Sequence, residues 1–117
     1  MKFKLRFSKS AVRDIEEVLA YTLAQFGQQK TEQYKELIRQ ALAEIATDPN
    51  HPPAKYRPEI HADARTFHLA RRGRRARHLF LYRVIGNEFV DIARLLHDSM
   101  EIERHLPEGL DLKDPQG

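Results

Sequence analysis

Toward its C-terminus the sequence reads HLFLYRVI at residues 78–85, GN at 86–87 and EFVDIARLLH at 88–97. Both flanking runs are rich in β-branched and aromatic residues, and the Gly86-Asn87 pair readily takes the positive φ that a tight hairpin turn requires. The segment therefore predicts a β-hairpin, with residue 85 opposite 88, 83 near 90 and 94 near 79. Both faces of residues 79–84 are mostly apolar, which indicates a central strand that is covered on both sides.

The N-terminal part of the chain predicts one strand and two helices. Residues 2–7 alternate phenylalanine and leucine with lysine and arginine, which is the period of a strand with one buried face. Ser8 is suited to cap a helix whose apolar stripe runs over residues 11–26, and Gly27 suits the end of that helix. A second apolar stripe runs over residues 34–45 until a proline stops it. The short link between the two helices predicts an antiparallel helical hairpin packed on the strands.

The middle of the chain predicts a stiff connection and one more strand. Four prolines at residues 49–58 exclude a helix or a central strand there. A strand is expected at residues 65–70, followed by an arginine-rich turn. After the hairpin, Asp98 or Ser99 can cap a last short helix, in which three apolar side chains would face inward: Met100, Ile102 and Leu106.

The predicted fold class is therefore α+β, with the element order βααβββα and an antiparallel sheet packed against an N-terminal helical hairpin. Residues 1–107 are expected to form a single domain, and residues 108–117 a polar, disordered tail. No apolar run approaches the roughly 18 residues of a membrane span, so we expect no membrane contact. The chain has no cysteine, which excludes disulfides, thiolate metal sites and a cysteine nucleophile and fits a cytoplasmic location.

Charge is segregated along the chain, although the formal net charge is only +3. Residues 55–83 carry nine Lys/Arg against two Asp/Glu, a balance of +7. This segment predicts an electropositive surface that could meet nucleic acid or an acidic protein partner, or a solvated hairpin tip. The histidines at positions 51, 61 and 68 have no spacing that makes a metal site. The glycines form no phosphate-binding loop, and we expect no cofactor and no metal.

The order and spacing of short motifs in this chain resemble the ParE toxins of bacterial toxin–antitoxin pairs. The strongest part of this resemblance lies near the C-terminus. It consists of Tyr-Arg-Val at residues 82–84, a short turn, Ile-Ala-Arg-Leu-Leu-His at 92–97, Met100 and a closing His-Leu at 105–106. Further matches are Phe-Ser at 7–8 and Phe-Gly at 26–27. The resemblance implies a type II system that stabilises a plasmid or genome. It also implies a cognate ParD-like antitoxin, whose acidic, partly disordered C-terminal arm wraps the toxin.

The resemblance further implies that the target is DNA gyrase, bound without any chemistry of the toxin's own, so no catalytic residue is assigned. The residues predicted to contact the target or its DNA are Arg74, Arg75, Arg77, Arg83, Arg94, Met100 and Leu106. Apolar residues predicted to receive the antitoxin, or else to belong to the core, are Leu23, Phe26, Phe67 and Leu69. Arg83 and Arg94 could instead pair with Asp91 or Glu88 in the sheet. The arginine-rich turn at residues 70–77 is longer than is usual for ParE, and it is a possible DNA contact.

Two alternatives remain open at the level of sequence. RelE relatives share the fold and cleave mRNA on the ribosome, a reaction that needs an acid, a base and cations around the phosphate. For such an endoribonuclease the candidate residues are Arg65, Arg83 and His97, while His78 or His97 could move a proton near neutral pH. The second alternative is a toxin-fold protein that has lost toxicity and only binds its partner.

Overall fold

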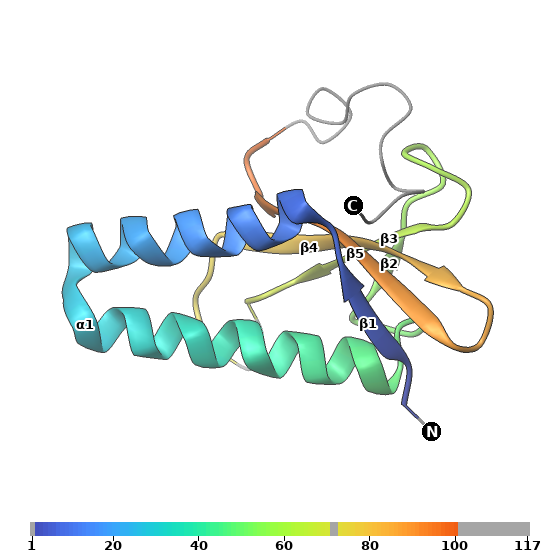
Figure 1. Cartoon of the computed structure of the whole chain (residues 1–117), viewed down its shortest axis with the longest axis horizontal. Coiled ribbons are helices and arrows are strands. Elements are labelled where there is room, and N and C mark those ends of the chain that lie inside the picture. Colours follow the sequence, from blue (N-terminus) through green and yellow to red (C-terminus); the bar gives the residue numbers. More distant parts are fainter. Residues whose placement is uncertain (1, 71–72, 101–117) are drawn as a thin grey trace.

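The computed structural model describes residues 2–70 and 73–100 of the chain. In chain order its elements are β1 (Lys4–Phe7), α1 (Lys9–Thr47), β2 (Lys55–Tyr56), β3 (Ala64–His68), β4 (His78–Ile85) and β5 (Phe89–His97). Figure 1 shows α1 folded back on itself as two long arms that lie beside a twisted sheet. The α+β class is therefore confirmed.

The two predicted helices are the two arms of α1, which is broken at Gly27. Gly27 has φ 88° and ψ 179°, a conformation that side chains other than hydrogen rarely allow. Ser8 caps the first arm as predicted: its Oγ accepts from the Ala11 N–H at 2.9 Å and donates to the Ala93 carbonyl at 2.7 Å. The same hydroxyl thus starts α1 and ties the helix to β5.

The sheet is mixed, which corrects the prediction of an antiparallel sheet. Its strand order is β1-β5-β4-β3-β2, and β1 runs parallel to β5 while every other pair is antiparallel. The alternation of residues 2–7 predicts a strand with one buried face, but it carries no information about the neighbour or direction of that strand. The two-residue β2 was not predicted either. It lies at the sheet edge between prolines, where a short strand is tolerated.

The hairpin of β4 and β5 is confirmed, but its predicted register is wrong. Ile85 pairs with Phe89, so the turn has one residue more than predicted. Leu81 pairs with Arg94 and Tyr82 with Ile92, which leaves Ala93 as the extra residue of a β-bulge. The longer turn and the bulge together bring His78 opposite His97 at the far end of the hairpin.

Two apolar clusters fill the two faces of the sheet. The larger cluster joins α1 to one face and includes Ile38, Ile45, Phe80, Tyr82 and Ile92. The smaller cluster contains Ala64, Leu81, Ala93 and Leu96, which alternation along the strands places on the opposite face. This agrees with the predicted covering of β4 on both sides.

The predicted C-terminal helix, Leu106 and the tail at 108–117 lie outside the described residues. After β5 the described chain makes a turn at residues 98–100. Within the part of the chain that the structure describes, no helix has both the length and the apolar character to cross a membrane.

Candidate functional site

Arg94, a predicted target contact, is bound by a carboxylate of α1. Its Nε donates to Asp14 Oδ2 at 2.7 Å and its Nη2 to Asp14 Oδ1 at 3.1 Å. The Leu95 N–H also donates to Asp14 Oδ2, at 2.9 Å. The hydrogen bonds to Asp14 raise the pKa of Arg94 further above its usual value. β1 pairs with β5 only as far as Ile92. Asp14 therefore supplies an acceptor for the Leu95 N–H, which lies beyond the reach of β1.

Arg83 and Asp91 are register partners, yet Asp91 is bound by another arginine. Arg6 on β1 donates to both Asp91 oxygens, at 2.6 and 3.1 Å, and Asp91 is almost fully buried. Arg83 Nε is buried and has no hydrogen-bond partner in the structure as described. The predicted pairing of Arg83 or Arg94 with Asp91 or Glu88 is therefore replaced by Arg6–Asp91 and Arg94–Asp14.

The arginine-rich connection between β3 and β4 divides into bound and exposed side chains. Arg77 forms an ion pair with Asp98 at 3.1 Å. Arg74 and Arg75 are exposed and make no ion pair with any residue that the structure describes. Arg74 also lines a cavity of about 220 Å³ beside the second arm of α1. Arg71 and Arg72 lie outside the described residues.

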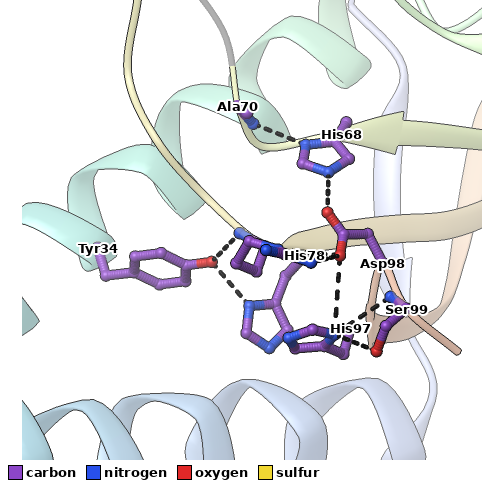
Figure 2. Close-up of polar contacts among 8 residues, drawn as sticks. Tyr34, His68, Ala70, His78, His97, Asp98 and Ser99 are labelled. Carbon is purple, nitrogen blue, oxygen red and sulfur yellow. Dashed lines mark hydrogen bonds and ion pairs between the residues drawn. The ribbon is translucent and has the colours of Figure 1, made fainter.

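Three histidines meet where β3 and β5 end and β4 begins, beside the second arm of α1. Figure 2 shows His68, His78 and His97 grouped around Asp98, with Tyr34 reaching in from α1. His68 Nε2 lies 2.9 Å from Asp98 Oδ2, and the Tyr34 hydroxyl lies 2.7 Å from His78 Nδ1. The rings of His78 and His97 meet edge to face with their centroids 5.2 Å apart. We call Tyr34, His68, His78, His97 and Asp98 the histidine cluster.

The hydrogen bonds fix the neutral tautomers of the cluster. His68 Nδ1 accepts from the Ala70 N–H and His97 Nδ1 accepts from the Ser99 N–H. The Tyr34 oxygen accepts from the Arg77 N–H, so its own proton is free to be donated to His78 Nδ1. His68 and His97 therefore accept at Nδ1 and, when neutral, carry their proton on Nε2, and the Tyr34 hydroxyl suits the same tautomer of His78.

The environment of the cluster shifts the pKa of several groups. Burial, followed by the nearby His97, lowers the pKa of His78 from 6.5 to about 4, so this ring is neutral at pH 7. Burial also raises the pKa of Tyr34, while the hydrogen bond from His68 lowers that of Asp98. Among residues 2–70 and 73–100, no group of three or more His, Cys, Asp or Glu side chains could hold a metal ion.

The three residues proposed for an endoribonuclease are not brought together. Arg65 lies over the ring of Tyr56, with its guanidinium carbon 5.0 Å from the ring centroid. Arg83 is five residues along β4 from His78, the partner of His97, which places its backbone roughly 16 Å away at the usual rise of a strand. The pair that the structure does bring together is His78 and His97. Tyr34, His68 and Asp98 were missed, because their approach depends on how α1 and β3 pack on the hairpin.

The predicted antitoxin contacts separate into core and surface. Phe67 and Leu69 are 1% and 2% exposed and belong to the larger core cluster, so they offer no surface to a partner. Leu23 and Phe26 are 48% and 63% exposed on the first arm of α1. Met100, a predicted target contact, is 39% exposed.

A groove of about 390 Å³ that the sequence did not reveal runs between the two arms of α1 and the end of β1. Its apolar lining consists of Phe7, Val12, Ile15, Leu19, Ile38 and Leu42, and Glu16, Lys35 and Arg39 complete it. Val12 is 44% exposed although it belongs to the apolar stripe of the first arm. That stripe is wider than the core contact requires, and this excess width is the signal from which the groove could have been predicted.

The fold agrees with comparisons to known proteins. The family model of the ParE toxin of the type II toxin–antitoxin system parDE matches residues 5–102, and the chain belongs to this family. A chain in the solved structure of a chromosomal ParDE TA system from P. aeruginosa is similar in fold, with a TM-score of 0.66 and 19% sequence identity. The match covers 82% of this chain and 96% of that chain. A comparison with curated proteins gives no match.

Proposed function

We propose that this ParE family protein acts in the cytoplasm as a toxin that binds DNA gyrase, traps its cleaved DNA complex and is neutralised by a ParD-like antitoxin. The observation that carries the proposal is the family match over residues 5–102. The toxin would act as a protein ligand and perform no chemistry of its own. Stabilisation of the plasmid or genome that encodes the pair would follow from loss of the antitoxin.

The separation of the candidate ribonuclease residues supports binding rather than cleavage. RNA cleavage requires a base, an acid and cations around one phosphate. Arg65 and Arg83 occupy neighbouring register positions of β3 and β4 but alternate onto opposite faces of the sheet, His97 lies at the far end of the hairpin, and Arg94 is held by Asp14. His78 and His97 do touch, which keeps an endoribonuclease as the second candidate function.

Gyrase itself provides the test of this proposal. The purified protein is titrated into a supercoiling reaction, and both the loss of supercoiling and the accumulation of cleaved DNA are scored. Cleaved DNA that rises with toxin and falls when the antitoxin encoded beside the toxin is added supports the proposal. Unchanged gyrase together with ribosome-dependent mRNA cleavage that His97→Ala abolishes would favour the ribonuclease instead.

For neutralisation, the groove between the arms of α1 offers an apolar seat of suitable size for part of the antitoxin arm. A disordered segment that folds on binding needs exposed apolar surface to offset its loss of conformational entropy. Lys35 and Arg39 at the groove are paired with Glu32 and Glu36, and Glu16 also lines it, so its apolar lining rather than its charge would attract a partner. The proposed occupant is therefore an amphipathic stretch of the antitoxin arm, with its apolar side chains in the groove.

Replacing Val12 by Asp tests this seat. Val12 is already 44% exposed, so the carboxylate should be tolerated in the folded toxin but should oppose burial of a partner's apolar side chains in the groove. We expect the dissociation constant for the antitoxin to rise at least about tenfold, which corresponds to about 1.4 kcal/mol, as measured by calorimetry.

Leu23→Asp is the matched control, because Leu23 is 48% exposed on the same arm and does not line the groove. A loss of affinity in Leu23→Asp but not in Val12→Asp would move the proposed antitoxin contact from the groove toward Leu23 and Phe26.

A contact with DNA is proposed for the exposed side chains of the arginine-rich connection. Arg74 and Arg75 are exposed and make no ion pair with any described residue, although Arg74, after Arg39, helps to lower the pKa of Glu36, so both side chains can reach a phosphate. Arg77 contributes less to such a contact, because it is shared with Asp98. In the gyrase complex these arginines would lie near the trapped DNA.

A further inference from the structure

The histidine cluster holds the chain where it leaves β5. The Asp98 N–H donates to the Arg77 carbonyl at 2.8 Å, and the Ser99 N–H donates to His97 Nδ1 at 3.1 Å. On the other side, the Tyr34 hydroxyl reaches from α1 to both His78 and the Arg77 N–H. The exit from β5 is thus connected to the second arm of α1 through His78, His97 and Arg77 (Figure 2).

The surroundings of this connection favour a neutral His78, which is half-buried and lies beside His97 and Arg77. A proton on His78 Nδ1 would turn an acceptor into a donor that faces the donating Tyr34 hydroxyl. Reversal of the hydrogen bond would require the Tyr34 hydroxyl to turn its own proton away and to accept a second hydrogen bond beside the one from the Arg77 N–H. The new positive charge would also lie against the ring of His97, 5.2 Å away, and near Arg77.

We propose that Tyr34, His78 and His97 form a proton-sensitive latch, which holds the exit of β5 to α1 while His78 is neutral and releases it when His78 is protonated. The groups that face His78 are Tyr34 from α1, His68 from β3, Arg77 from the preceding connection, His97 from β5 and Asp98 from the following turn. Asp98 is the one group among these that favours the protonated ring, and it is already bound by His68 and Arg77.

The sign of the pH dependence follows from the direction of the His78 shift. The pKa of His78 is about 4 in the folded protein and 6.5 in an unfolded chain. Below pH 6.5 the unfolded or released state binds more protons than the latched state, so the latch weakens as pH falls toward 4. Asp98, whose pKa is lowered, adds its own loss of stability only at more acidic pH.

Hydrogen exchange measured by NMR tests the latch directly. Protection factors, which correct for the intrinsic pH dependence of exchange, are compared at pH 7.5 and pH 5 for the amides of Arg77, Asp98 and Ser99. We expect these protections to fall about tenfold at pH 5 relative to amides at the centre of β4. At that pH His78 takes up a proton in the released state but stays neutral in the latched state, where its pKa is about 4.

Two variants separate the latch from general acid sensitivity. His78→Asn keeps an acceptor near the place of Nδ1 that cannot be protonated, so its protections should not change between the two pH values. His61→Asn is the matched control, because His61 also accepts a backbone N–H at Nδ1 but lies before β3 and outside the cluster. This control should keep the tenfold fall.

Two results would overturn the latch. One is a wild-type His78 ring that titrates near pH 6.5 by its nitrogen chemical shifts while the three amides keep their protection. The other is a His78→Asn protein that loses protection as the wild type does. If His78→Asn fails to fold, Tyr34→Phe serves in its place, because it removes the hydrogen bond that joins His78 to α1 and should reduce the pH-dependent fall.

Discussion

Two groups of arginines among the described residues differ in what surrounds them. Arg6, Arg94 and Arg77 each bind a carboxylate: Asp91, Asp14 and Asp98 respectively. Arg74 and Arg75, only a few residues before Arg77, are exposed and make no ion pair with any described residue. The first group stabilises the fold around β5, and the second presents charge to solvent.

The difference shows that arginine content alone does not define a binding surface. Arg94 and Arg74 look equivalent as predicted target contacts. In the structure, however, Asp14 binds both the Arg94 side chain and the Leu95 N–H and so fixes Arg94 to α1. An arginine that is neutralised in this way adds little to the field that a DNA phosphate or an acidic partner meets. The exposed arginines are therefore the better candidates for partner binding.

The largest effect is expected when Asp14 is replaced by Ala. The change removes the carboxylate from the partly buried Arg94 and leaves the Leu95 N–H without its acceptor. Loss of both interactions should lower the free energy of unfolding by about 2–3 kcal/mol, measured by urea denaturation.

Glu16→Ala is the control for Asp14, because Glu16 is an exposed acid two residues further along the same arm. It should change stability by less than about 0.5 kcal/mol. If the two substitutions lowered the free energy of unfolding equally, Arg94 would contribute no more to stability than the exposed arginines do.

The smallest effect on stability is expected at the exposed arginines themselves. Replacing Arg74 and Arg75 by Ala should leave the free energy of unfolding within about 0.5 kcal/mol of the wild type, because neither has an ion pair to lose among the described residues. If the same urea experiment showed a loss of unfolding free energy as large as that of Asp14→Ala, the two arginines would belong with Arg6, Arg77 and Arg94, which stabilise the fold.

Local patterns predicted much of the fold. The cap at Ser8, the break at Gly27 and the β4–β5 hairpin all follow from short-range preferences of the chain. The parallel pairing of β1 and the bulge at Ala93 were missed, because both depend on contacts between distant segments. A register error of two residues at the end of the hairpin hid the approach of His78 to His97.

The candidate site was predictable only in part, and for the same reason. The sequence marked Arg77, Arg83 and Arg94 as cations but could not supply their surroundings, since Asp14 and Asp98 come from other elements. Phe67 and Leu69 were equally ambiguous, because an apolar residue of a strand can belong to the core or to an interface. The groove depends on the spacing of two helical arms that no local pattern fixes.

The most direct test of the account measures gyrase-cleaved DNA as a function of toxin concentration for the wild type and two charge-reversed variants. Arg74→Glu with Arg75→Glu reverses the exposed connection, while Lys9→Glu with Arg13→Glu makes the same change of charge on exposed positions of α1. We expect cleaved DNA to accumulate with the wild type and the α1 variant, and to require at least about tenfold more of the Arg74/Arg75 variant. Gyrase that accumulates no cleaved DNA at a large excess of folded wild-type protein would contradict the proposed function, and equal potency of the three proteins would remove the exposed arginines from it.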